Sequence, residues 1–508
     1  MKVRIFRLFV WVFVMMAVFA MPAGGEEVSN QAMQDQIRAL KQMVLELQKR
    51  IQHLEAGRSK TKGGETSAKK APSESEPPKK TTAKAPTGAK KSALPRSTSA
   101  KAGKVHKGVP MPGEEKLQPV GAKPPAPLDI AGHEVRVGIS GAIQADVIHD
   151  FNAVGLKPGD GQAREFITAL IPVGGPATDI TNRTTFSPNQ SYLTGWAETD
   201  TPFGPFKVYA NVNLMGSTTE PEFQVYKIYG EWGWLKAGLD YTLWINQAAI
   251  PNTLDFEGPN AAPEMRYTQG SLKIPLRPGA EKPELFFTVG AEDAQADMTL
   301  PAGVTPVNQF PAVVGKFSYE PDWTHIELAG LYRRLKAEGA GYDQSIDGWG
   351  VAFSGSVDTW GQDNFIWGLE YGDALGAYIQ DTAGLGLDAA PVSATNTTLR
   401  AITAFGAWGA YQHWWTRSLR SSATYGFVRL NSDFDLLQPP EFAGTGTYKQ
   451  TQYASMNLVW SPWPPFDVGL EYMFGHRTVT DLTAVDDSTT GQNHRVQFTM
   501  RWNFDWER

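Results

Sequence analysis

The stretch HRVQFTMRWNF, residues 494–504, alternates apolar and polar side chains without a break. Side chains of a β-strand point alternately to opposite faces, so Val496, Phe498 and Met500 share one face and Arg495 and Gln497 the other. A strand of about five or six residues is usual in soluble proteins, whereas about nine to eleven are needed to cross a bilayer at a tilt. The length and pattern of this stretch therefore indicate a membrane-spanning β-strand.

Three other stretches, 135–147, 206–215 and 465–477, show the same alternation. Their charged residues fall almost entirely on one face, and aromatic residues gather toward the strand ends, where a membrane barrel carries its interfacial girdle. A soluble β-sandwich also alternates, so strand length is what favours the barrel.

The same alternation continues along the chain. It predicts an all-β fold, a transmembrane antiparallel barrel of about sixteen strands. Short turns such as 201–205, 320–322 and 461–465 alternate with long connections at 150–185, 245–263, 294–310, 374–397 and 432–447. Short periplasmic turns and long external loops are typical of such barrels, and sixteen strands leave an aqueous lumen. The expected strands begin near residues 134, 190, 206, 223, 235, 264, 284, 311, 324, 346, 363, 398, 419, 449, 466 and 492.

The N-terminus has the features of a secretory signal peptide over residues 1–25. Lys2, Arg4 and Arg7 precede an apolar run at 8–21, and small residues follow before Glu26. A signal anchor retained in the inner membrane is the alternative. Elsewhere no apolar run approaches the ~20 residues of a membrane-spanning helix.

Residues 26–56 are predicted to form a periplasmic coiled coil. Apolar residues recur at alternating spacings of three and four, which places them on one seam of a helix. An amphipathic helix packed on the barrel is the alternative. The general rules for seam residues favour a dimer, whereas the segment RIQHLE at 50–55 resembles a trimer-specifying pattern, which we follow. The core residues are Ile37, Leu40, Val44, Leu47, Ile51 and Leu54.

Residues 57–128 read as a disordered linker rich in Lys, Pro and Ala. Residues 57–127 carry a net charge of +11 and almost no large apolar side chain, so they cannot bury enough surface to offset the entropy of ordering. The segment is a plain tether, or it also contacts anionic peptidoglycan. From residue 128 onward the net charge is −19, and the barrel is expected over 129–508.

Several segments of this region resemble the DcaP-like family of trimeric outer-membrane porins. They are TPFGPFKVYANVNLMG at 201–216, IPNTLDFEGP at 250–259, NLVWSPWPPFDVGLEYMFG at 457–475, and the residues around 413–421. The resemblance spans roughly 130–508 and implies a homotrimer in the outer membrane, with an N-terminal coiled coil in the periplasm. It also implies that the external loop 245–263 folds into the pore.

Passive permeation needs a constriction whose size and fixed charges select solutes. The loop 245–263 offers Asp255 and Glu257, and arginine binds carboxylates through two hydrogen bonds. We therefore expect an arginine wall that favours small organic anions such as dicarboxylates. Alternatively, the arginines pair with Glu198, Glu231, Asp467 and Glu471. The arginines placed on the lumenal face are Arg136, Arg266, Arg400, Arg420, Arg477, Arg495 and Arg501.

Other functions have little support in the sequence. The chain has no cysteine, and its eight histidines form no nucleophile pair or metal-ligand cluster, so neither an enzyme nor a metal or other cofactor is expected. The basic linker lacks interleaved aromatics, which disfavours nucleic-acid binding. The main rival is a structural protein with a plugged lumen that tethers the outer membrane to peptidoglycan.

Overall fold

The computed structural model describes residues 128–130, 133–155, 164–216, 221–277, 282–339, 341–393, 395–431, 447–480 and 487–507. The predicted signal peptide, the coiled coil with its core residues, and the linker up to residue 127 lie outside these ranges. Among the described residues, no helix has the length and apolar character needed to cross a membrane.

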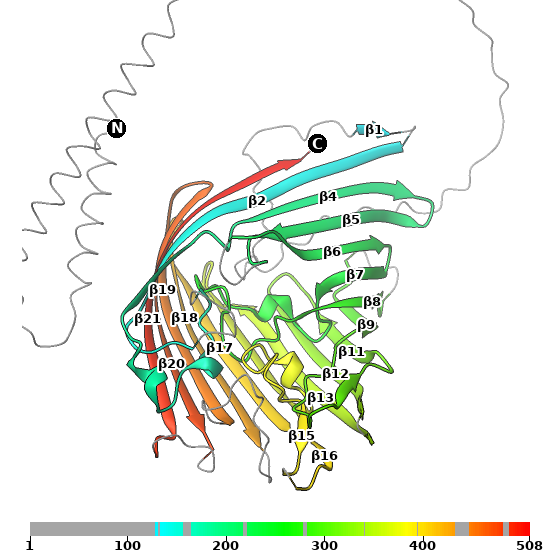
Figure 1. Cartoon of the computed structure of the whole chain (residues 1–508). Helices are drawn as coiled ribbons and strands as arrows, with labels where there is room; N and C mark the ends of the chain where they lie inside the picture. Colours follow the sequence, from blue (N-terminus) through cyan, green and yellow to red (C-terminus); the bar gives the residue numbers. More distant parts are fainter. Residues whose placement is uncertain are drawn as a thin grey trace, which may run out of the picture. The chain divides into compact units, whose positions relative to one another are not determined.

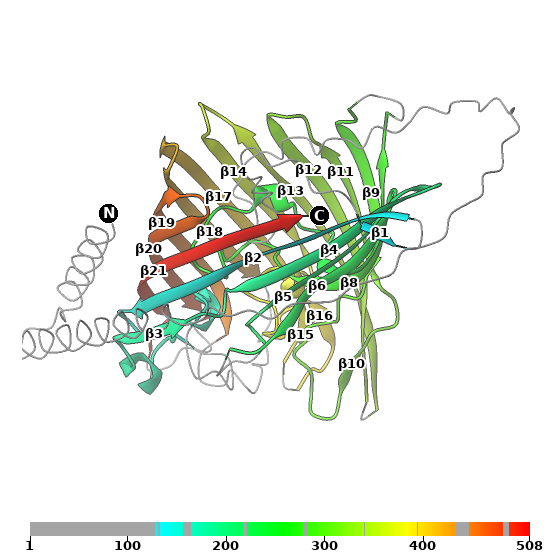
Figure 2. The same ribbon diagram turned by 90° about the horizontal axis from the view of Figure 1, so that it is seen from above.

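Sixteen antiparallel strands form a closed barrel (Figure 1), which confirms the predicted fold class. Each wall strand pairs with the next along the ring, and β21 pairs with β2 from Gly138–Glu507 to Asp150–Arg495, which closes it. Figure 2 shows these two strands side by side at the seam. The wall strands are β2 (His133–Asp150), β4 (Tyr192–Thr201), β5 (Gly204–Asn213), β6 (Gln224–Trp232), β7 (Leu235–Tyr241), β8 (Arg266–Pro275), β9 (Leu285–Glu292), β11 (Ala312–Tyr319), β12 (Thr324–Gly339), β13 (Tyr342–Asp358), β14 (Asn364–Asp373), β17 (Thr403–Thr416), β18 (Leu419–Asn431), β19 (Tyr448–Trp463), β20 (Phe466–Val479) and β21 (Thr490–Glu507).

Shorter elements lie at the strand ends and in the loops. β1 (Leu128–Ile130) and β3 (Arg183–Ser187) pair with β2, and β10 (Thr305–Val307) pairs with β12. The 3-10 helices η1 (Thr168–Leu170), η2 (Pro176–Asp179), η3 (Gln247–Ala249) and η4 (Gly376–Tyr378) all belong to long connections.

The strand predicted to begin near 398 differs most from the structure. Residues 399–401 form β16 (Leu399–Ala401), which pairs with β15 (Ala389–Pro391) in a separate two-stranded sheet. Ile402 lies between two ladders: its N–H bonds to Asp388 in register with β15–β16, and its carbonyl accepts from Ala374 in register with β14 and β17, which begins at Thr403. The alternation runs through this change of partner, so periodicity alone could not locate it.

The two faces of the wall differ as a membrane barrel requires. In β20, Leu470 and Tyr472 point outward with 51% and 45% of their surface exposed, whereas the alternate residues Glu471 and Met473 are fully buried. Large aromatic side chains are exposed near the short turns, as expected of an interfacial girdle; they include Phe203, Trp234, Trp323, Trp360 and Trp463. The outer face of the barrel is therefore apolar, whereas the inward face combines buried polar and charged side chains with an apolar cluster where the loops pack on the wall.

The height of the wall varies around the ring. β12 and β13 have 16 and 17 residues, whereas β6, β7, β8 and β9 have 9, 7, 10 and 8. The connection between β7 and β8, residues 242–265, therefore leaves the wall where the strands are short. We call it the inner loop.

Candidate pore constriction

The inner loop runs into the barrel and binds the inward face of β19, β20 and β21. Glu471 on β20 accepts hydrogen bonds from the backbone amides of Leu254 and Asp255. Asn457 on β19 donates to the carbonyl of Asn252 at 2.7 Å, and Gln497 on β21 donates to that of Leu254, also at 2.7 Å. Because β7 and β8 lie far from these strands around the ring, the loop bridges the lumen, as the family resemblance implied.

Buried side chains hold both flanks of the inner loop. The indole of Trp244, only 2% exposed, donates to Glu370 on β14 at 2.8 Å, and that of Trp408 on β17 donates to the carbonyl of Ala249 at 2.7 Å. Asn260 donates to the hydroxyl of Thr451 on β19 at 2.8 Å. Fixed groups along its length give the inner loop a defined path.

Two other external loops pack against the inner loop within the barrel. The amide of Phe166, from the loop after β2, donates to Asp255 at 3.2 Å. Asp381, from the loop after β14, accepts from the hydroxyls of Thr168 and Tyr448 at 2.7 and 2.8 Å. Burial raises the pKa of Asp381, although these hydrogen bonds oppose the shift. Three external loops thus form one layer inside the lumen.

A buried ion pair contacts the inner loop. Arg495 on β21 donates to both carboxylate oxygens of Asp150 on β2, at 2.8 and 3.0 Å, and both side chains have at most 1% of their surface exposed. A further guanidinium nitrogen lies 3.8 Å from the carboxylate of Asp255. Burial raises the pKa of Asp255 well above its usual value, and Arg495 opposes that rise.

Three of the other predicted arginines are paired with acids, as the alternative interpretation expected. Arg420 on β18 and Arg501 on β21 both contact Asp467, at 3.5 and 3.2 Å. Arg136 on β2 binds Glu198 on β4 at 2.6 Å. These pairs neutralise much of the positive charge that an arginine wall would present to the lumen.

The remaining predicted residues have different surroundings. Arg477 on β20 donates to the carbonyl of Ile171 at 3.1 Å, and the Arg266 guanidinium stacks on the Tyr226 ring at 3.7 Å. Glu257 is buried in the inner loop. Arg400 is exposed on β16, which belongs to the separate two-stranded sheet and not to the barrel wall. The structure therefore does not bring Arg400 together with the other predicted residues.

A partly open pocket of about 80 Å³ lies between the inner loop and the inward face of β2 and β4–β7. Sequence analysis did not single out this pocket. Alternation places Asn211 and Asn213 on the lumenal face, but it does not show at what depth a side chain lies. The lining residues outside the inner loop are Gln144, Gln190, Tyr192, Asn211, Asn213, Tyr226, Tyr241 and Arg501; the inner loop contributes residues 250–256 and Glu264.

Glu264 lies in the inner loop just before β8. Burial, reinforced by the nearby carboxyls of Glu257 and Asp255, raises its pKa to about 8, while Arg266 opposes the shift. Near neutral pH this carboxyl is therefore mostly protonated and can donate a hydrogen bond.

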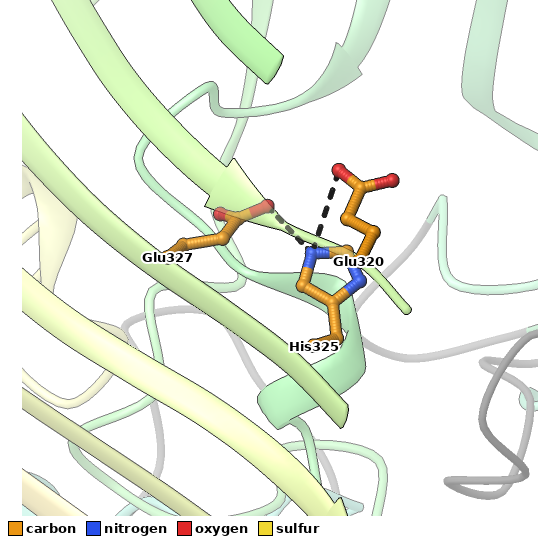
Figure 3. Close-up of side chains that lie close together, drawn as sticks. All are labelled: Glu320, His325 and Glu327. Carbon is orange, nitrogen blue, oxygen red and sulfur yellow. Dashed lines mark hydrogen bonds and ion pairs between the residues drawn. The ribbon is translucent and has the colours of Figure 1, made fainter. Parts of the chain in front are cut away.

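A separate cluster of polar side chains lies where β11 turns into β12. Figure 3 shows the imidazole of His325 between Glu327, at 2.9 Å, and Glu320, at 3.8 Å. Within the described ranges these three residues are the group spaced to hold a metal ion. Lys316, however, binds Glu327 and Lys273 binds Glu320, each at 2.8 Å. The lysines neutralise both carboxylates, so the cluster is a salt-bridge network.

The same network contacts the start of the inner loop. Lys316 also donates to the carbonyl of Ile245 at 3.0 Å. Although burial opposes it, the pKa of Glu320 is lowered, chiefly by Lys273 and His325. The network therefore helps to anchor the loop on the β11–β12 side.

Among solved structures, the chain is similar to the outer-membrane channel DcaP of Acinetobacter baumannii. The identity is 17%, the TM-score is 0.61, and the match covers 75% of this chain and all of that one. OmpT of Vibrio cholerae in its trimer form (10% identity, TM-score 0.45) and the anion-selective porin from Comamonas acidovorans (11%, 0.41) are less similar; each match covers 73% of this chain and 99% of theirs. No protein-family model matches the sequence, and no curated protein is significantly similar to it.

At these identities the similarity establishes the fold, which is the β-barrel of outer-membrane channels. The resemblance to DcaP-like porins noted in the sequence is thereby confirmed at the level of the fold.

Proposed function

We propose that this protein is an outer-membrane porin through which small hydrophilic solutes diffuse passively. The course of the inner loop carries the proposal, because its bonds to Asn457, Glu471 and Gln497 make it cross the lumen and narrow it without catalytic groups. The apolar outer face supports a membrane location, which by the barrel fold is the outer membrane.

Conductance of the purified full chain in planar bilayers tests the proposal. We expect the current to rise in steps of fixed size. Liposomes that carry the protein should also swell when they are placed in a solution of a small, uncharged solute. A correctly folded barrel that gives neither would contradict it. That outcome would favour the alternative, a structural protein that tethers the membrane to peptidoglycan through its basic linker, of which residues 57–127 lie outside the described ranges.

A preference for small organic anions remains a hypothesis. Pairing of Arg420 and Arg501 with Asp467, and of Arg136 with Glu198, weakens the positive field it needs. Reversal potentials in a salt gradient measure the preference, and a clear cation preference would reject it.

We also propose that the protein forms a homotrimer in the membrane. The motif at residues 50–55 and the family resemblance support this assembly state. Native mass spectrometry of the detergent-extracted protein tests it, and a monomer that persists in several mild detergents would contradict it.

A further inference from the structure

The pocket under the inner loop has an unusual balance of polar groups. Five carboxamide side chains line it, together with the phenols of three tyrosines. Each carboxamide can both donate and accept hydrogen bonds, whereas a site for anions needs donors and positive charge. The carboxamides are Gln144, Gln190, Asn211, Asn213 and Asn252.

The charged residues of the pocket are already occupied. The Asp255 carboxylate accepts from the amides of Phe166 and Gly258, at 3.2 and 3.3 Å. Arg501 is bound to Asp467. Glu264 is mostly neutral near pH 7, as its raised pKa requires. Because Arg420 binds the same Asp467 carboxylate, Arg501 is only partly neutralised. Asp255 lines the same pocket and opposes this charge, so the pocket carries little net charge.

Among the residues that the structure describes, none accepts a hydrogen bond from the side-chain nitrogen of Asn252. The residue is only 7% exposed. The bond from Asn457 holds the backbone carbonyl at this position. A buried polar group without a partner is costly, and a solute acceptor would relieve that cost.

Beside these amides lies an aromatic surface. The Tyr226 ring meets Tyr241 edge-on at 5.9 Å between centroids and Phe256 at 6.1 Å. Aromatic rings in a pocket provide flat apolar surface, and tyrosine adds a hydroxyl at its edge.

We propose that this pocket binds a neutral polyhydroxylated solute, of the monosaccharide class, on its way through the barrel. The inference rests on the porin function proposed above. Sugar hydroxyls both donate and accept, which matches the carboxamides, and the C–H face of a sugar ring packs against the aromatic surface. A dicarboxylate would offer acceptors only and would meet the Asp255 carboxylate.

Ion current through single channels of the full chain, recorded with glucose or succinate added, tests this inference. Glucose should reduce the current reversibly and saturably, and succinate should do so much less. Asn252→Ala should raise the concentration of glucose that blocks half of the current about fivefold, because one neutral hydrogen bond is lost. Gln247→Ala is the matched control, since Gln247 is an amide of the same loop that does not line the pocket. It should leave the block unchanged.

The outcomes separate the two proposals. Absence of any conductance overturns the porin function itself. Conductance that glucose does not affect, or that succinate blocks more strongly, overturns the sugar site and leaves the porin intact. If Asn252→Ala does not fold, Tyr226→Leu removes the aromatic surface instead and should also weaken the block by glucose; an unchanged block in a folded variant overturns the site.

Discussion

Glu471 is the residue whose replacement tests the inner loop most directly. One of its carboxylate oxygens accepts from the amides of both Leu254 and Asp255. Glu471→Ala leaves two buried N–H groups without an acceptor, at about 1–3 kcal/mol each, so the attached state loses about 2–6 kcal/mol. At 1.4 kcal/mol per factor of ten, the population with a detached loop tip rises between about thirtyfold and 10⁴-fold.

Single-channel recordings measure the consequence. We expect Glu471→Ala to show a larger mean conductance and more open-channel noise than the wild type, because the tip at residues 252–255 no longer stays across the lumen. Glu471→Gln is the matched control, since its amide oxygen can still accept both bonds. If Glu471→Ala matches the wild type in conductance and noise, the inner loop does not set the constriction.

Three other predictions concern charge and stability. As pH rises through about 8, Glu264 ionises and the channel should become more cation-selective in reversal-potential measurements, whereas Glu264→Gln should show no such change. Because the pKa of this carboxyl is raised in the folded state, its contribution to stability is complete below its usual pKa of 4.5 and is lost as pH rises from there to about 8. Arg495→Ala leaves the Asp150 carboxylate buried without its partner and should lower the free energy of unfolding by about 3–5 kcal/mol in denaturant titrations. Arg334→Ala, which breaks an exposed ion pair, should lower it by less than about 1 kcal/mol. Equal losses in the two variants would contradict the role of the buried pair. Leu470→Arg puts a charge on the outer face and should cost about 2–4 kcal/mol in bilayer folding assays, and an unaffected folding equilibrium would argue against lipid contact there.

The alternation of apolar and polar residues predicted the strands of the barrel wall well, because such a strand must present different faces to lipid and water. Expected strand starts at 235, 324, 419 and 466 are those of β7, β12, β18 and β20. Arg495 and Glu471 were assigned to the lumenal face, and both are buried there.

The contacts inside the barrel could not be predicted from the sequence in the same way. The bond from Leu254 to Glu471 joins residues 217 positions apart, and no local pattern encodes such a contact. Likewise, the pairing of Arg420 and Arg501 with a single acid depends on which strands become neighbours and at what register. For this reason the sequence indicated the arginines but not their partners, and it did not reveal the pocket at Asn252.

The low wall at β6–β9 has a consequence for the surroundings of the barrel. The seven residues of β7 rise about 24 Å along the strand, which a tilt near 40° reduces to about 18 Å, less than the ~25 Å apolar belt of such barrels. The paired part of β7 is therefore shorter than the apolar layer of the bilayer beside it. The sector is therefore the side of the barrel where contact with another protein surface would relieve the greatest mismatch with the bilayer.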